Sequence, residues 1–252
     1  MSFDVAGDAY DNFMGRYSQP LAQTFTDWLP ISPGQRALDV GCGPGAWAAV
    51  LARRLGPRNV SAVDPSSLFV AACRATLPDV DVRQAKADAL PYADDTFDVV
   101  GANLVVSFMP NPRAGLSEMA RVTRPGGRIA ATVWDLAGGR APMAPVWTAF
   151  DVLGLPLVDE THMPGGAPGE IASMLDDIGL TDVTDTELVV RLRHNTFDEW
   201  WEPYLHAVGP IGEAVAALAP AEREQLRAAC REALGPGPFD VTAVAHAARA
   251  TV

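Results

Sequence analysis

The stretch Ala37-Leu38-Asp39-Val40-Gly41-Cys42-Gly43-Pro44-Gly45 decides the fold of this chain. It predicts a short buried strand that ends in a glycine-rich turn, and residues 46–55 after it predict a helix. Glycines at alternate positions leave the backbone without Cβ atoms where a ligand must come close. The start of the following helix offers unpaired N–H groups. A turn of this kind is suited to hold a nucleotide-like cofactor.

Composition and charge restrict the possible partners. The chain has 252 residues, of which 48% are apolar and 20% charged, as is ordinary for a globular protein. Its 31 acidic and 19 basic residues give a formal net charge of −12. This balance argues against a nucleic acid or an anionic membrane as the main partner, because both demand a positive surface. We therefore expect a small-molecule partner and no nucleic acid.

Cysteine usage and hydropathy indicate the setting of the protein. Cys42, Cys73 and Cys230 are far apart and form no Cys-x-x-Cys pair, so we predict neither a zinc site nor a disulfide framework. No apolar run approaches the roughly 18–20 residues of a membrane span, and the first residues lack the pattern of a signal peptide. We expect a cytoplasmic protein without a membrane span. The oligomeric state, monomer or homodimer, stays open.

Strands and helices alternate through the first half of the chain. Short runs rich in β-branched residues predict strands at 36–40, 59–63, 80–84, 97–102 and 128–134, and we expect a turn at Arg124-Pro125-Gly126-Gly127. Alternation at this spacing predicts an α/β fold with a doubly wound, mostly parallel sheet that is covered by helices on both faces.

The remaining segments are expected to complete one domain, residues 1–252. Residues 1–34 contain an amphipathic segment that is either a lid or a plain core helix, and residues 35–134 form the cofactor-binding core. The regular alternation of strands and helices ends after Trp134, and we expect substrate-side insertions at 135–168 and 195–236. Weak alternation at 239–249 suggests a final antiparallel strand.

Two cofactor classes use such an architecture. A dinucleotide is one, because Gly41, Gly43 and Ala46 fit a loose G-x-G-x-x-G/A pattern and Asp64 follows about 20 residues on. The other is S-adenosylmethionine, which has no phosphate and carries a sulfonium and an ammonium group. Asp39, one residue before the glycine turn, suits an ammonium better than a pyrophosphate. Asp88, after the third strand, is placed to read adenine.

An ordered set of motifs resembles the class I S-adenosylmethionine-dependent methyltransferases, and is closest to their ubiquinone/menaquinone-type small-molecule branch. These motifs are the run 37–45, Asp64, Asp88-Ala89-Leu90-Pro91, Phe97-Asp98-Val99-Val100 and the run 121–127. The N-terminal Tyr10 to Ser18 stretch is similar to the lid of an uncharacterised bacterial subgroup of this family. The resemblance implies a Rossmann-like, seven-stranded sheet whose last strand is antiparallel, with an N-terminal lid helix and an inserted helical cap.

The resemblance also assigns cofactor-binding roles by position. It places Gly41 and Gly43 at the methionine moiety, with Asp39 near its ammonium group. It assigns the ribose hydroxyls to Asp64. The adenine-side residues are Pro65, Asp88 and the Ala89 N–H. Asn103 and Leu104 are expected near the amino group and the sulfonium. Arg16 is our expectation for the cofactor carboxylate and Tyr10 for a lid contact.

The methyl acceptor is expected to be a small apolar or aromatic molecule. Residues expected to wall its pocket are Met14, Tyr17, Trp134 and Trp201. The candidate bases His162, His194 and His206 are scattered, so no catalytic base is assigned, and no metal is expected. Two alternatives stay open: an NAD-linked oxidoreductase, and a non-catalytic cofactor-binding protein of the same fold.

Overall fold

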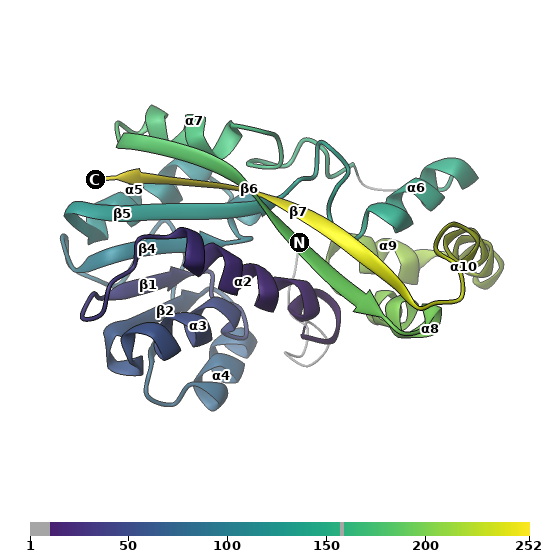
Figure 1. Cartoon of the computed structure of the whole chain (residues 1–252), viewed down its shortest axis with the longest axis horizontal. Helices are drawn as coiled ribbons and strands as arrows, with labels where there is room; N and C mark the ends of the chain where they lie inside the picture. The colour runs from purple at the N-terminus through teal and green to yellow at the C-terminus, as the bar shows by residue number, and fades with distance from the viewer. Residues whose placement is uncertain (1–10, 157–158) are drawn as a thin grey trace.

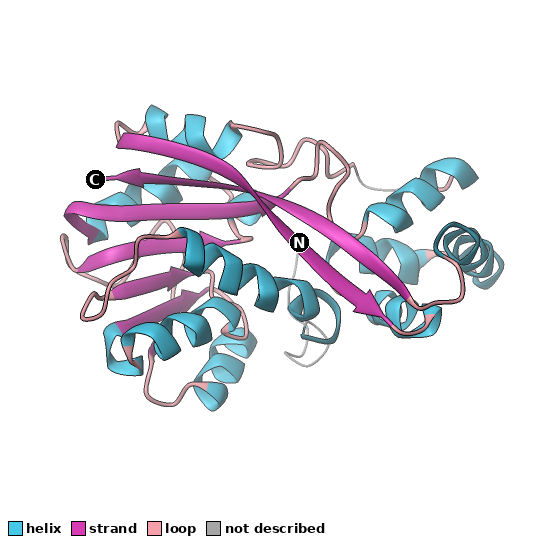
Figure 2. Cartoon of the chain, in the orientation of Figure 1, coloured by secondary structure: helices cyan, strands magenta, loops and turns pink. Residues whose placement is uncertain are grey.

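The computed structural model of the chain describes residues 11–156 and 159–252. Seven strands form one sheet in the order β3-β2-β1-β4-β5-β7-β6 (Figures 1 and 2). The bounds of the strands are β1 Ala37–Val40, β2 Val60–Asp64, β3 Asp81–Gln84, β4 Phe97–Asn103, β5 Thr123–Trp134, β6 Thr181–His194 and β7 Phe239–Thr251. The first five strands run parallel, and β7 pairs antiparallel with both β5 and β6. The expected fold, including its antiparallel last strand, is confirmed.

Helices cover both faces of the sheet (Figure 1). The bounds of those along the sheet are α2 Arg16–Trp28, α3 Ala46–Leu55, α4 Ser67–Thr76, α5 Pro112–Val122 and α7 Glu170–Asp177. Right-handed crossovers from β1 to β2 and from β4 to β5 run in opposite directions along the sheet, so their helices fall on opposite faces. Ser66 caps α4 and Asn111 caps α5, each accepting a backbone N–H bond.

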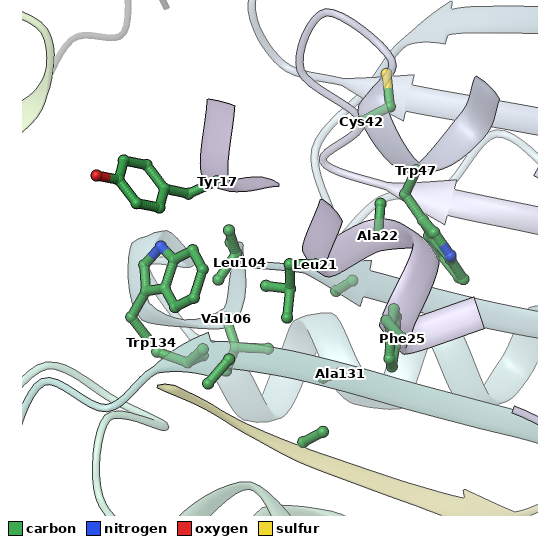
Figure 3. Packing of buried hydrophobic residues seen from close by; sticks show 14 of the residues in the cluster. Tyr17, Leu21, Ala22, Phe25, Cys42, Trp47, Leu104, Val106, Ala131 and Trp134 are labelled. Atoms are coloured by element: carbon green, nitrogen blue, oxygen red, sulfur yellow. The ribbon is translucent and has the colours of Figure 1, made fainter. Parts of the chain in front are cut away.

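The N-terminal segment packs as a core helix. It begins with a π-helical turn, η1 (Asp11–Gly15), and continues as α2, which buries Leu21, Ala22 and Phe25 against the rest of the core (Figure 3). The indole N–H of Trp47 in α3 donates to Thr26 Oγ1 at 2.9 Å and joins the two helices. The lid expectation thus applies only to the beginning of this segment, which borders the cavities described below.

A helical cap lies between β6 and β7, beyond the end of the other strands (Figure 1). Its elements are α8 Phe197–Trp201, η4 Glu202–His206, α9 Gly209–Ala217 and α10 Pro220–Leu234. Helix α6 (Ala144–Leu153), from the expected 135–168 insertion, packs against α10. The remaining short helices are η2 Pro57–Asn59 and η3 Val106–Phe108.

One local expectation about the sheet is wrong. The segment Arg124-Pro125-Gly126-Gly127 is not a separate turn but belongs to β5, which already begins at Thr123. Thr123 pairs with Phe97, and the register shifts before Arg128 pairs with Val99. Gly126 has φ +76°, so the residues that looked like a turn form an irregularity inside the strand. Along the described residues, no helix is long and apolar enough to cross a membrane.

Candidate functional site

A cavity of about 610 Å³ opens where the chain leaves β1, β2 and β4. The strand order reverses between β1 and β4, and ligands of open α/β sheets bind outside the carboxyl ends of strands at such a point. The volume lies within the range of about 300–1,000 Å³ that is usual for small-molecule sites. Most of the predicted cofactor residues line this cavity, which we call the donor cavity: Asp39, Gly41, Gly43, Asp64, Pro65, Asp88, Asn103 and Leu104.

The glycine turn is fixed by the neighbouring strand. The N–H groups of Gly41 and Cys42 both donate to the Val63 carbonyl, at 2.8 and 2.9 Å. Gly41 has φ +75°, and a Cβ atom there would lie 2.5 Å from Val105. Only glycine combines this backbone conformation with such a close approach, so Gly41 lets Val105 pack directly against the turn.

Asp39 is a buried carboxyl that lacks a complete set of partners. It is 1% exposed, and among the described residues its Oδ2 has no hydrogen-bond partner. Burial raises the pKa of Asp39 to about 8, which the Ala48 N–H at the start of α3 partly opposes and the charge of Asp64 reinforces. A cationic group in the donor cavity would supply the missing partner, whereas a pyrophosphate would be repelled. The site therefore fits the ammonium of S-adenosylmethionine.

Asp64 joins the glycine turn to the end of β2. Its Oδ2 accepts the Gly43 N–H at 2.9 Å, and its Oδ1 accepts the Ser66 N–H at 2.8 Å. Burial raises the pKa of this carboxyl, while these two bonds act in the opposite direction. Each carboxylate oxygen can accept more than one hydrogen bond, so Asp64 can still receive two hydroxyl groups of a ribose.

The end of β4 carries an unusual backbone. Leu104 has φ +64°, a left-handed conformation that is uncommon for a residue with a side chain. Its N–H donates to the Thr132 carbonyl at 2.9 Å, and Asn103 Oδ1 accepts the Thr132 hydroxyl at 2.7 Å. These bonds to β5 hold the chain as it leaves the sheet and place Leu104 between the donor cavity and a second cavity.

Three predicted cofactor residues are not placed in the donor cavity. The Ala89 N–H donates to the Lys86 carbonyl at 3.2 Å, so this donor is already used, although Asp88 beside it does line the cavity. Arg16 is absent from the lining of the donor cavity and forms an ion pair with Glu199 of α8, so the structure does not place it at the expected contact with the cofactor carboxylate. Tyr10 lies outside the described residues.

The second cavity, about 60 Å³, is almost wholly apolar, and we call it the acceptor cavity. Three residues line both cavities and form their common wall: Leu104, Ser107 and Phe108. The predicted substrate residues Met14 and Trp134 line the acceptor cavity, and the Trp134 indole lies beside Leu104 in Figure 3. Strand ends and the loops after them therefore bring the two cavities together.

The other two predicted substrate residues lie elsewhere. The Tyr17 hydroxyl bonds to His194 Nε2 at 2.8 Å, and Tyr17 lines neither cavity. Trp201 packs in an aromatic cluster with Phe197 and Trp200 inside the cap and lines neither cavity. The structure therefore places neither residue at the expected acceptor pocket: Tyr17 joins α2 to β6, and Trp201 packs within the cap.

One polar residue of the acceptor cavity escaped the sequence reasoning. Glu160, in the 135–168 insertion, is buried, and its Oε2 has no hydrogen-bond partner among the described residues. Burial raises the pKa of its carboxyl to about 7, partly opposed by the nearby Trp147 indole, which does not reach full hydrogen-bond geometry. An acidic residue within an apolar, proline-rich insertion was the only available signal.

No histidine of the described residues lines either cavity. His162 and His206 are exposed, His194 is bonded to Tyr17, and His246, which the sequence reasoning did not consider, lies 3.1 Å from Asp135. Within 11–156 and 159–252, no group of histidine, cysteine and acidic side chains is arranged to hold a metal ion.

Comparison with known proteins identifies the family. A model described as a methyltransferase domain matches residues 38–131. Nocamycin O-methyltransferase of Saccharothrix syringae is 30% identical over 217 residues, which are 77% of this chain and 76% of that protein. Demethylmenaquinone methyltransferase of Halalkalibacterium halodurans is 39% identical over 107 residues, or 40% of this chain and 44% of that protein. This second match thus spans less than half of the relative's length.

A solved structure shows the same fold. The YcgJ protein from Bacillus subtilis superposes with a TM-score of 0.58 at 17% identity, covering 93% of this chain and 97% of that one. The chain belongs to the S-adenosylmethionine-dependent methyltransferases. Both the family and the Asp39 carboxyl, whose Oδ2 has no partner among the described residues, disfavour the NAD-linked alternative.

Proposed function

We propose that this protein transfers the methyl group of S-adenosylmethionine to a small, mainly apolar acceptor that lies in the acceptor cavity. The observation that carries this proposal is the wall shared by the two cavities, formed by Leu104, Ser107 and Phe108. A donor on one side of this wall and an acceptor on the other would lie next to each other. The sulfonium supplies a methyl carbon already activated for in-line displacement.

Residues of the donor cavity would hold the donor by its polar groups. Asp39 would pair with the ammonium, Asp64 would receive the ribose hydroxyls, and Asp88 would face the adenine. The glycine turn would lie against the methionine part. Holding two reactants in a productive arrangement can lower the activation barrier by roughly 7–11 kcal/mol, so alignment is the main contribution expected from the protein.

The lining of the acceptor cavity supports an apolar or aromatic acceptor. Its walls include Phe13, Met14, Val133 and Trp134, which suit a molecule with an apolar body. The relative from Saccharothrix syringae is named as an O-methyltransferase, and this favours an oxygen atom as the site of methylation.

From the small size of the acceptor cavity we infer that the cap moves when an acceptor binds. A water molecule needs about 10–15 Å³ of such space, so 60 Å³ holds only a few waters. Val208, Gly209, Pro210 and Ile211, at the start of α9, form one side of the cavity. A displacement of this cap segment would enlarge the acceptor cavity and leave the donor cavity unchanged.

The proposal is tested first by calorimetric titration with S-adenosylhomocysteine and with NADH. We expect binding of S-adenosylhomocysteine at micromolar concentration and no binding of NADH; the opposite result would overturn the proposal. The second step is incubation with radiolabelled S-adenosylmethionine and a panel of hydroxylated aromatic and polyketide-like acceptors. Label that moves into an apolar acceptor supports the acceptor class, and label that moves only into highly polar acceptors contradicts it.

A further inference from the structure

Glu160 is the single ionisable residue among the described residues that line the acceptor cavity. It is 6% exposed, and within 11–156 and 159–252 its Oε2 atom has no hydrogen-bond partner. A buried carboxylate without a partner costs several kcal/mol, so such groups are concentrated at functional sites.

A second polar atom of the same cavity also lacks a partner. The Trp134 indole N–H is buried without a hydrogen-bond acceptor among the described residues, and Trp134 lines the cavity with Glu160. Apart from the Ser107 hydroxyl in the wall shared with the donor cavity, the described lining is apolar around one strong hydrogen-bond acceptor, Glu160, and one indole donor, Trp134. Ligand sites show this composition: apolar walls with a few polar groups that fix orientation.

We infer that Glu160 binds the hydroxyl of the methyl acceptor and takes its proton during transfer, so that the substrates are apolar molecules with a phenol-like or enol-like hydroxyl. This inference rests on the proposed function. A hydroxyl has one hydrogen, which a single carboxylate oxygen satisfies, whereas an ammonium has three and would leave some unpaired in this cavity. The Trp134 N–H would bind a second oxygen of the acceptor, such as a neighbouring carbonyl.

Methyl transfer and proton transfer would occur together in this step. The hydroxyl oxygen forms a bond to the methyl carbon while the bond from that carbon to sulfur breaks, and its electron pair stays on sulfur. The hydroxyl proton passes to the Glu160 carboxylate. One positive and one negative charge are neutralised together, which an apolar cavity favours because no net charge is left buried.

The titration of Glu160 suits this role. Burial brings the pKa of its carboxyl to about 7, and a base is most effective when its pKa lies near the working pH. Among the described residues, no charged neighbour is a cause of this pKa shift. Trp147 beside it is uncharged, and the nearby Asp159 and His162 are exposed and lie 3.6 Å from each other.

Phenol and toluene provide a matched pair of probes, since they have nearly the same shape and differ by a hydroxyl. A purely apolar cavity would prefer toluene, because burying an unpaired hydroxyl is unfavourable. We expect the wild-type protein at pH 8.5 to bind phenol at least tenfold more tightly than toluene, measured by ligand-observed NMR. Glu160→Gln should reduce this preference to threefold or less, and Glu213→Gln, an exposed residue of α9, should leave it unchanged.

Lowering the pH supplies a readout that a merely structural glutamate would not affect. At pH 5.5, where Glu160 is protonated, the wild-type preference for phenol should fall at least threefold, while Glu160→Gln should show no change. Three results would each overturn the inference. They are tighter binding of toluene than of phenol to the wild type, the same ratio of phenol to toluene affinity in Glu160→Gln as in the wild type, and no binding of either probe at 10 mM.

The measurements are made with and without S-adenosylhomocysteine. Its affinity for Glu160→Gln should remain within twofold of the wild type, which shows that the variant is folded. Failure of the wild type to bind S-adenosylhomocysteine would overturn the proposed function. The ratio of phenol to toluene binding in the cofactor-free protein would still decide the role of Glu160.

Discussion

At the scale of single residues, the two acids of the donor cavity have different tasks. Asp64 accepts two backbone N–H bonds and thereby shapes the glycine turn, so its charge is already stabilised. Asp39 keeps an unpartnered oxygen in the wall of the cavity. The first residue therefore shapes the turn and, under the proposed function, also binds the donor, whereas the second would pair with the donor's cation.

Asp39 should release a proton when the donor binds. Burial raises its pKa to about 8, so it is mostly protonated at pH 7 in the free protein, and an ammonium beside it favours the ionised form. Calorimetric titration with S-adenosylhomocysteine in two buffers of different ionisation enthalpy should show release of up to one proton. The release should disappear in Asp39→Asn, and a wild-type enthalpy that does not depend on the buffer would contradict this assignment.

Replacing Asp64 should weaken donor binding. Asp64→Ala removes a charged hydrogen-bond acceptor and leaves the Gly43 and Ser66 N–H groups without their partner, so we expect more than a tenfold loss of S-adenosylhomocysteine affinity. Asp79→Ala, an exposed acid before β3, makes the same chemical change outside the cavity and is the control. Equal affinities of the two variants would remove Asp64 from the binding site.

At the scale of elements, α2 and β6 hold the cap against the sheet. Arg16 pairs with Glu199 of α8, and Tyr17 bonds to His194 at the end of β6. Arg16 and Tyr17 are neighbours in the chain. The contact of Arg16 is partly exposed, and that of Tyr17 is buried. They connect the beginning of α2 to the base of the cap.

His194 should make this junction sensitive to acid. Burial, and then the Arg16 guanidinium, lower the pKa of His194 to about 4 from its ordinary 6.5. Between these two values the unfolded chain binds more protons than the native protein, so the free energy of unfolding falls as the pH falls through this window. In urea titrations from pH 7.5 to 4.5, the wild type should lose stability more steeply than His194→Gln. His206→Gln, at an exposed histidine, should follow the wild type, and parallel curves for His194→Gln would refute the prediction.

The contact of β4 with α3 depends on a glycine. A Cβ atom at Gly101 would lie 2.3 Å from the ring of Trp47, which is itself buried. Gly101→Ala should therefore lower the free energy of unfolding by about 1–3 kcal/mol, as is typical of overpacked cores. In a double-mutant cycle, Trp47→Phe should remove much of this cost, because the clashing atoms are gone. Additive effects would show that the ring is not what excludes a side chain here.

At the scale of the whole molecule, the donor should stabilise the native state. A ligand at 100 times its Kd that binds only the folded protein adds about 2.7 kcal/mol. For a chain of this size each kcal/mol raises Tm by about 2–4 °C, so saturation with S-adenosylhomocysteine should raise Tm by about 5–11 °C. A thermal unfolding scan in which this concentration of S-adenosylhomocysteine leaves Tm unchanged would contradict binding to the native state.

The parts that sequence predicted well are those that local patterns encode. The glycine turn follows β1, Asp64 is the last residue of β2, and Asp88 lies in the loop after β3, and parallel strands bring such positions to one edge of the sheet. Arg16 and Tyr17 were misplaced because their partners are 183 and 177 residues away, and no local pattern reports such pairs. Glu160 was missed for the same reason, since its environment is assembled from η1, the loop after β4, and α9.

The cap is carried between two long strands that extend beyond the rest of the sheet, and this has a consequence for how the protein can diversify. His194 pairs with Phe239, so the chain leaves β6 and returns to β7 at neighbouring points. The segment 195–238 therefore has closely spaced ends. Under the proposed function, grafting the corresponding segment of a relative onto this hairpin should change the acceptor and leave the methyl donor unaltered.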